Sequence, residues 1–194
     1  VSSVDGSGLV VINSKVAMKP GRYCSVTADS LYVRRNKIGP WIQDCQFIAN
    51  GDDGMNFHSI GSIISAKINA TTLQLDSSWS INQYEVGDEV VIWDSDPGTG
   101  TPVYRTVISK DSANLQLVFS GNTGDIDLSN SNSVNNSVVY NITRANPRFM
   151  VKNCLIQDCA GSGFVLCSRN GAVIGNIFSG VASCALKMTN IHIE

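Results

Sequence analysis

Two stretches of the sequence decide the fold: MVKNCLI, Met150–Ile156, and AVIGNIF, Ala172–Phe178. Both are short runs of strand-forming residues, and each is followed by glycine-rich or small-residue punctuation and a second short run, Gly163–Leu166 and Ala185–Met188. The step from Met150 to Ala172 equals the step from Gly163 to Ala185. A constant step of this size, about 22 residues, is typical of one turn of a solenoid, in which each turn packs only on its neighbours.

An earlier copy of the pattern is WIQDCQF, Trp41–Phe47. Its cysteine, Cys45, precedes Cys154 by the same number of positions by which Gly54 precedes Gly163. This step exceeds one turn by about 87 residues, which we interpret as an insertion. Cys24 precedes Cys45 by close to one turn, so we expect the coil to begin near the N-terminus.

The inserted segment has a different sequence pattern. Runs such as Glu89–Trp93 and Asn114–Phe119 alternate in side-chain character and are separated by turn residues, a pattern typical of antiparallel strands. We predict an all-β chain: a right-handed parallel β-helix of about 22-residue turns with a small inserted antiparallel β-barrel. The predicted parts are residues 1–59 and 144–194 for the β-helix and residues 60–143 for the insertion. The pattern requires no helix anywhere.

Composition narrows the classes of function. The 194 residues carry 14 Lys and Arg against 16 Asp and Glu, for a net charge of −2, without a basic run that could follow phosphates. No stretch approaches 18 uninterrupted apolar residues. We therefore expect neither a nucleic acid nor a membrane as partner. The last residues read as a strand still in progress, so we expect the chain to be part of a longer protein.

Three carboxylates are the strongest candidates for chemistry. Asp52 and Asp53 stand between Gly51 and Gly54, and adjacent like charges raise each other's pKa, so they oppose stability. Asp29 precedes Asp52 by close to one turn of the predicted coil. Residues one turn apart stack at about 4.8 Å. The sequence therefore predicts that Asp29, Asp52 and Asp53 converge on one patch of surface.

Such a cluster suits two kinds of chemistry. It can divide protons between a general acid and a general base, as an inverting glycosidase requires, or it can bind a hard cation such as Ca²⁺. We predict catalysis by Asp52, Asp29 and Asp53, with no metal and no cofactor. His58, Asn56, Arg169 and Arg34 are the candidates for contacting a carbohydrate substrate.

The sequence also carries a family resemblance. The runs Gly21–Tyr32, Ile42–Phe47 and Gly51–His58, with the return run Arg144–Val151, resemble glycoside hydrolase family 110, β-helical exo-α-galactosidases of the pectate-lyase-like superfamily. The resemblance implies an inserted β-barrel, removal of terminal α-galactose with inversion, and a secreted or periplasmic location. It implies Asp52 as general acid, with Asp29 and Asp53 holding the attacking water.

Departures from related families leave alternatives open. Polygalacturonases share the spacing of one Asp a turn before an Asp pair, but their Gly-His-Gly and Arg-Ile-Lys signatures are missing, and members of family 110 are longer than 194 residues. The alternatives to an inverting glycosidase are a non-catalytic carbohydrate- or Ca²⁺-binding β-helix, and a polygalacturonase-like or lyase-like enzyme acting on a polysaccharide. The sequence does not determine the linkage, the glycan or the oligomeric state.

Overall fold

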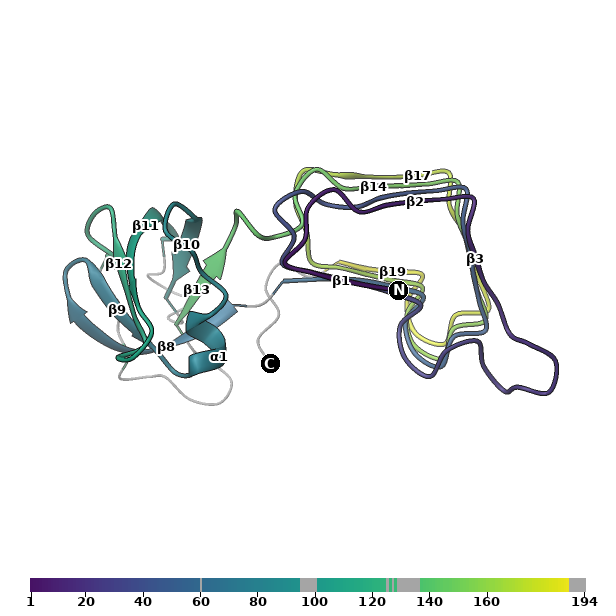
Figure 1. The fold of residues 1–194 in the computed structure, drawn as a ribbon, viewed down its shortest axis with the longest axis horizontal. Helices are drawn as coiled ribbons and strands as arrows, with labels where there is room; N and C mark the ends of the chain where they lie inside the picture. Colours follow the sequence, from purple (N-terminus) through teal and green to yellow (C-terminus); the bar gives the residue numbers. More distant parts are fainter. Residues whose placement is uncertain (60, 95–100, 125, 127, 129–136, 189–194) are drawn as a thin grey trace. The chain divides into compact units, whose positions relative to one another are not determined.

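The structure is a computed structural model that describes residues 1–59, 61–94, 101–124, 126, 128 and 137–188 (Figure 1). The described chain forms two compact units. The first contains residues 1–59 and 144–188, and the second contains the described residues between 61 and 143. The division falls after Ser59 and before Arg144. Residues 60 and 189–194, at the edges of the predicted parts, lie outside the described residues.

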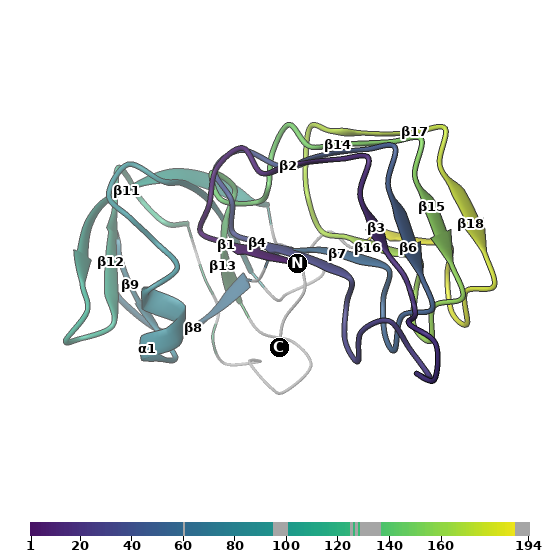
Figure 2. The ribbon, with the colours of Figure 1, turned by 45° about the vertical axis from the view of Figure 1, so that its right-hand side comes forward.

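The first unit consists of three parallel sheets, to which successive passes of the chain each add a strand. The five-stranded sheet has the order β1 (Ser2–Val4), β4 (Leu31–Arg34), β7 (Met55–His58), β16 (Phe164–Leu166) and β19 (Leu186–Met188). A four-stranded sheet contains β2 (Val10–Ile12), β5 (Trp41–Gln43), β14 (Met150–Lys152) and β17 (Ala172–Ile174). The other contains β3 (Lys15–Val16), β6 (Gln46–Ile48), β15 (Leu155–Gln157) and β18 (Ile177–Ser179), seen side by side in Figure 2.

This architecture corrects the predicted fold class. The described residues are all-β apart from one short helix, but they form three separate parallel sheets and a closed antiparallel barrel. The predicted single right-handed parallel β-helix is therefore wrong as a description of the fold. The prediction that all turns are about 22 residues long is also wrong. Val11 pairs with Ile42 and Val151 pairs with Val173, and the first of these steps is the longer, although neither contains the insertion. The first turn can be longer because residues outside the sheets are not bound to the spacing of the core.

Corner residues explain how the chain turns from one sheet to the next. Between the two four-stranded sheets, Asn13, Asp44, Asn153 and Gly175 all have φ between 50° and 63°. Asparagine, aspartate and glycine tolerate this left-handed conformation better than other residues do. The N–H of each of the first three donates to a carbonyl of the next turn, over 2.9–3.1 Å. Each of the four turns therefore has, at this corner, a residue that adopts the left-handed conformation readily.

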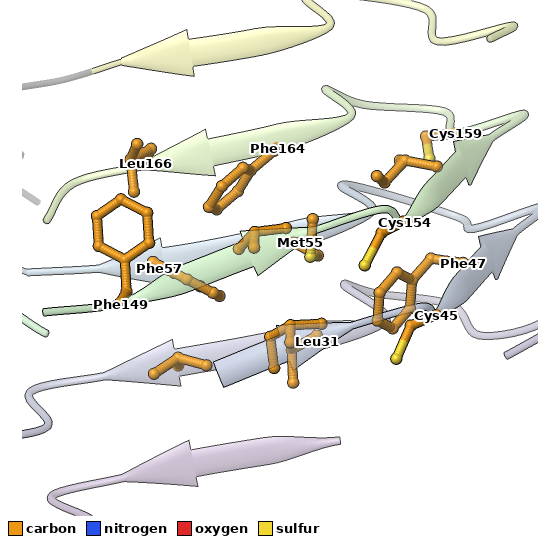
Figure 3. Packing of buried hydrophobic residues seen from close by; sticks show 14 residues of the cluster. Leu31, Cys45, Phe47, Met55, Phe57, Phe149, Cys154, Cys159, Phe164 and Leu166 are labelled. Atoms are coloured by element: carbon orange, nitrogen blue, oxygen red, sulfur yellow. The ribbon is translucent and has the colours of Figure 1, made fainter. Parts of the chain in front are cut away.

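The core of the first unit lies between the three sheets (Figure 3). Leu31, Met55 and Phe164 occupy paired positions on neighbouring strands and are fully buried. The ring of Phe57 meets those of Phe149 and Phe164 edge to face, with centroids 5.7 and 4.7 Å apart. Because each strand sends alternate side chains inward, the core is a stack of like residues, one layer from each turn.

Cysteines take part in this stacking. Cys45 and Cys154 are buried at equivalent positions, and Asn176 occupies the equivalent position one turn later, where its Oδ1 accepts from the N–H of Cys154 over 2.8 Å. Cys159 and Cys167 are also buried, whereas Cys24 is half-buried and Cys184 is exposed. None of these six cysteines, all within the described residues, forms a disulfide. Cys24 does not continue the stack, since Lys15 pairs with Gln46 and this leaves Cys24 in the loop that follows β3.

The second unit is a closed barrel with the strand order β10-β11-β12-β9-β8-β13, and all its paired strands are antiparallel. The strands are β8 (Gly61–Asn69), β9 (Thr72–Leu75), β10 (Glu89–Trp93), β11 (Val103–Asp111), β12 (Gln116–Phe119) and β13 (Val138–Asn141). Their inward residues, including Leu73, Val90, Leu117 and Val139, form its buried core.

The barrel also contains a helix, α1 (Ser78–Ile81), so the expectation that no helix is needed is wrong. Ser77 caps it by accepting from the N–H of Ser80 over 3.2 Å. So short a helix gives almost no periodic signal, which is why the pattern did not reveal it. Among the described residues, no helix is long and apolar enough to cross a membrane.

Candidate functional site

The carboxylates of Asp29, Asp52 and Asp53 gather where the chain enters two neighbouring strands of the five-stranded sheet. Asp29 lies two residues before β4, and Asp53 lies two residues before β7. Leu31 pairs with Met55, so Asp29 and Asp53 stand at the same level of the two chains. The N–H of Ser30 donates to the carbonyl of Asp53 over 3.3 Å and continues this register beyond the strands.

One carboxylate oxygen of each residue lies within 4.8 Å of those of the other two. Asp29 and Asp53 are half-buried, and Asp52 is exposed. Coulomb repulsion between neighbouring carboxylates is strong at this range, and it weakens when one of them is protonated. The cluster is therefore a place where the chain accepts an electrostatic cost, which is common at functional sites.

Residues of the next turn, directly before β16, form hydrogen bonds with Asp53 and Asp52. The N–H of Ser162 donates to Asp53 Oδ1 over 2.5 Å, and the N–H of Gly161 donates to the Asp52 carbonyl over 3.1 Å. A Cβ on Gly161 would lie 2.8 Å from Asp52 Oδ1 and closer still to Asp53 Oδ1. Only glycine leaves room for both carboxylates here.

Burial is the main cause that raises the pKa of Asp29, followed by the charge of Asp53; the charge of Asp52 acts in the same direction, and a hydrogen bond from the Asn56 side chain opposes it. Burial is also the main cause that raises the pKa of Asp53, against hydrogen bonds from Ser162 and the charge of Lys187. Both half-buried carboxyls therefore hold their protons to higher pH than a free aspartate does.

Of the predicted substrate-contacting residues, the structure brings Asn56 to the cluster. Asn56 lies on β7 opposite Tyr32 on β4, and its side chain bonds Asp29. It therefore orients a carboxylate and is well placed to contact a substrate bound to the cluster.

His58 and Arg34 lie at the other end of these strands. They pair with each other in the register, and the His58 ring is buried with its centroid 6.0 Å from that of Tyr32. The path from Asp53 to His58 covers roughly 16 Å along an extended strand. The structure therefore does not bring either residue into the cluster, and both could contact only a ligand that extends along the sheet.

Arg169 is also remote from the carboxylates. It lies three residues after the end of β16, whereas the residue level with Asp53 in that turn, Ser162, precedes β16. The Arg169 carbonyl accepts from the N–H of Arg148 over 3.2 Å, and its buried Nε has no hydrogen-bond partner among the described residues. Arg169 therefore lies in the connection between β16 and β17 and is not part of the cluster.

Sequence reasoning missed Gly161, Ser162 and Lys187 as neighbours of the cluster. A signal for the first two was present, because the step from Gly54 to Gly163, applied to Asp52 and Asp53, gives Gly161 and Ser162. Lys187, on β19, pairs with Val165, which pairs with Asn56. Lys187 thus belongs to a row of residues that crosses the sheet beside the cluster.

Neither a protein-family model nor a curated protein matches this chain. Three oxygen-donor side chains at this spacing can exchange protons with a bound substrate or coordinate a hard cation.

Proposed function

We propose that this chain hydrolyses a glycosidic linkage by acid/base catalysis at Asp29, Asp52 and Asp53. The observation that carries the proposal is the convergence of three carboxylates within 4.8 Å, two of them half-buried and held by neighbours. Most glycoside hydrolases use a pair of carboxyl groups, one protonated and one ionised. The third carboxylate helps to hold the attacking water.

Terminal α-linked galactose is the substrate to test first, with inversion at the anomeric carbon. This choice rests on the resemblance of residues 21–58 to glycoside hydrolase family 110. The carboxyl groups of inverting enzymes usually lie roughly 6.5–9.5 Å apart, against about 5–5.5 Å in retaining enzymes. The 4.8 Å limit applies to one chosen oxygen of each residue, so the product anomer has to decide between the two outcomes.

The family resemblance and the burial of the carboxyl groups favour different residues as the general acid. The resemblance gives the general acid to Asp52, whereas burial favours retention of a proton by Asp29 and Asp53. Strongly coupled carboxyl groups titrate together, so the proton that the cluster retains is not assigned to one residue by burial alone. We assign the acid to Asp52 because it is exposed and can reach a leaving-group oxygen.

The experiment measures galactose release from an aryl α-galactoside and from an α-1,3-galactosyl oligosaccharide, with the first-formed anomer followed by NMR. We expect β-galactose, and a loss of about 10²–10⁴-fold in Asp52→Asn. Asp44→Asn is the matched control, because Asp44 occupies a corner position where the next turn has Asn153. Fully active Asp52→Asn, first-formed α-galactose, or a folded chain that releases no galactose would each contradict the proposal.

Leaving-group dependence separates the acid from the residues that hold water. If Asp52 is the acid, the loss of activity in Asp52→Asn is smaller on aryl galactosides, whose phenol needs little protonation, than on alkyl galactosides. Asp29→Asn and Asp53→Asn would lose activity on both kinds of substrate. The opposite pattern would move the acid role to Asp29 or Asp53.

A second candidate is a non-catalytic site for a divalent cation. The observation that favours it is the same convergence, since oxygens around Ca²⁺ at roughly 2.3–2.6 Å also lie within about 5 Å of one another. This candidate predicts saturable Ca²⁺ binding by calorimetry, lost in Asp53→Asn, together with no turnover of any galactoside. Turnover that is unchanged after chelation would exclude it as the function of the cluster.

A further inference from the structure

The loop between β3 and β4, residues 17–30, sets the first turn apart from the others. The same connection in the three later turns is less than half as long, at 49–54, 158–163 and 180–185. Figure 1 shows the longer loop projecting beyond these shorter ones. The additional residues are not needed to form the turn, so they require another explanation.

The base of this loop is fixed to the corner that carries Asp52 and Asp53. The N–H of Ser25 donates to the Ala49 carbonyl over 2.7 Å, and the N–H of Gly51 donates to the Val26 carbonyl over 2.8 Å. Ser25 Oγ also donates to Asn50 Oδ1 over 3.0 Å. These bonds hold the returning half of the loop in a defined position directly before Asp29.

The loop borders a half-open hollow of about 590 Å³, a size typical of small-molecule sites. It is lined by residues between Ala17 and Thr27, which include two cations, Lys19 and Arg22, and one aromatic residue, Tyr23. None of the described residues that line it is acidic. Tyr23 is fully exposed in the part of the chain that the structure describes, with a relative exposure of 104%.

The hollow and the carboxylate cluster adjoin along the chain. Thr27 lines the hollow and Asp29 belongs to the cluster, two residues and at most about 7.6 Å apart between Cα atoms. An anionic group on a substrate is repelled by three carboxylates but attracted by Lys19 and Arg22. Arginine also matches a carboxylate or sulfate with a planar pair of donors, and an exposed tyrosine ring can cover the face of a sugar.

We propose that the hollow binds a sugar unit bearing an anionic group, next to the linkage that the carboxylate cluster hydrolyses. Lys19 and Arg22 pair with the anion, and the Tyr23 ring stacks on the sugar. This inference rests on the proposed hydrolysis and specifies its substrate class. A uronic acid and a sulfated sugar offer the same anionic chemistry, and the test distinguishes them.

The test measures binding by calorimetry in the Asp52→Asn background, so that ligands are not consumed. Three α-galactosyl oligosaccharides differ only in the unit next to the terminal galactose, which is neutral, a uronic acid or sulfated. We expect one of the charged ligands to bind roughly tenfold more tightly than the neutral one at low salt, with the difference shrinking as ionic strength rises. Lys19→Ala/Arg22→Ala should remove this preference, and Tyr23→Ala should weaken all three ligands.

Lys37→Ala is the matched control, since Lys37 is an exposed cation of the same unit that does not line the hollow. It should leave the preference unchanged. Equal affinities for neutral and charged ligands, or a preference that survives in Lys19→Ala/Arg22→Ala, would overturn the inference. Turnover of an aryl α-galactoside by the wild-type chain is measured separately: its absence would refute the proposed hydrolysis, whereas the ratio of affinities tests the hollow alone.

Discussion

Ser162 donates its backbone N–H to Asp53 Oδ1 over 2.5 Å, although the two residues are 109 positions apart. Hydrogen bonds from both the N–H and the side chain of Ser162 lower the pKa of Asp53 against the larger effect of burial. Donors to a carboxylate favour its ionised form. Ser162 thus helps Asp53 to act as the ionised member of the cluster.

Ser162→Ala should therefore shift the pH dependence of hydrolysis. The backbone donor remains and the side-chain donor is lost, so the pKa of Asp53 rises further and the acid limb of kcat/KM moves to higher pH. Ser162→Thr keeps a hydroxyl and should restore the limb. A pH profile of aryl galactoside hydrolysis for the three proteins checks this, and an unmoved limb in Ser162→Ala would rule out an ionised Asp53 as the essential base.

Gly161→Ala should disrupt the cluster without unfolding the chain. The added Cβ would lie 2.8 Å from Asp52 Oδ1 and closer to Asp53 Oδ1, so both carboxylates must move. Misplacing catalytic groups by about 1 Å can cost roughly 10²-fold in rate, and we expect a loss of that order in kcat. Gly121→Ala is the control, because its nearest neighbour is the flexible side chain of Arg105 at 3.3 Å. Normal kcat in a folded Gly161→Ala would show that the observed carboxylate positions are not required.

Asp29→Asn should stabilise the chain at neutral pH. The pKa of Asp29 is raised in the folded state, so the unfolded chain loses this proton first as pH rises above 3.8. Stability therefore falls through the window from 3.8 to the raised pKa and stays lower above it. The variant lacks this loss. Because solvent screens a half-exposed charge, we expect a gain of at most about 1 kcal/mol, or roughly 2–4 °C in Tm, at pH 7.

Thermal unfolding at pH 3 and pH 7 measures this effect. Below pH 3.8 the carboxyl is protonated in both states, so wild type and Asp29→Asn should have nearly equal Tm there. Asp44→Asn, at an exposed corner, is the control for the Asp-to-Asn substitution itself. A variant that is less stable than wild type at pH 7 would mean that the ionised Asp29 is stabilised by its neighbours.

The parts of the fold that sequence could predict are those set by repeated core and corner residues. The step from Gly54 to Gly163 equals the step between the paired residues Met55 and Phe164. Each inward side chain must meet its equivalent in the next turn, so the register leaves a trace in the sequence. The convergence of Asp29 with Asp53 follows from that register, although it was argued only from spacing.

The lengths of loops and the surroundings of individual side chains could not be predicted from the repeat. The loop of residues 17–30 lies outside the sheets, where length is not tied to core packing, and Cys24 was therefore placed in the wrong register. The repeated step predicted which strands are neighbours, but it could not show that they form three separate parallel sheets, so the predicted fold class was wrong. His58 and Arg34 are predicted to contact the substrate, but an extended strand carries both of them away from Asp53.

Phe57→Ala should strongly destabilise the unit that carries the cluster. Phe57 is fully buried and contacts two other rings edge to face. Removing a buried phenyl ring typically costs about 3–5 kcal/mol through lost contacts and a residual cavity. Hydrogen exchange followed by mass spectrometry should show faster exchange in β4, β7 and β16. Protection unchanged in these strands would contradict the packing described for this core.

Tyr84→Phe should weaken the barrel alone. The buried Tyr84 hydroxyl donates to the Val139 carbonyl over 2.6 Å, and burial raises the pKa of Tyr84, so the group stays protonated as a donor. Losing the hydroxyl removes one partner of a buried pair, which costs about 1–3 kcal/mol. Because Tyr84 and Val139 both belong to the barrel core, exchange should accelerate in β10 and β13 and not in β7 or β16. Equal acceleration in both sets of strands would show that the two units unfold as one, and the effects of Phe57→Ala and Tyr84→Phe could then not be assigned to separate units.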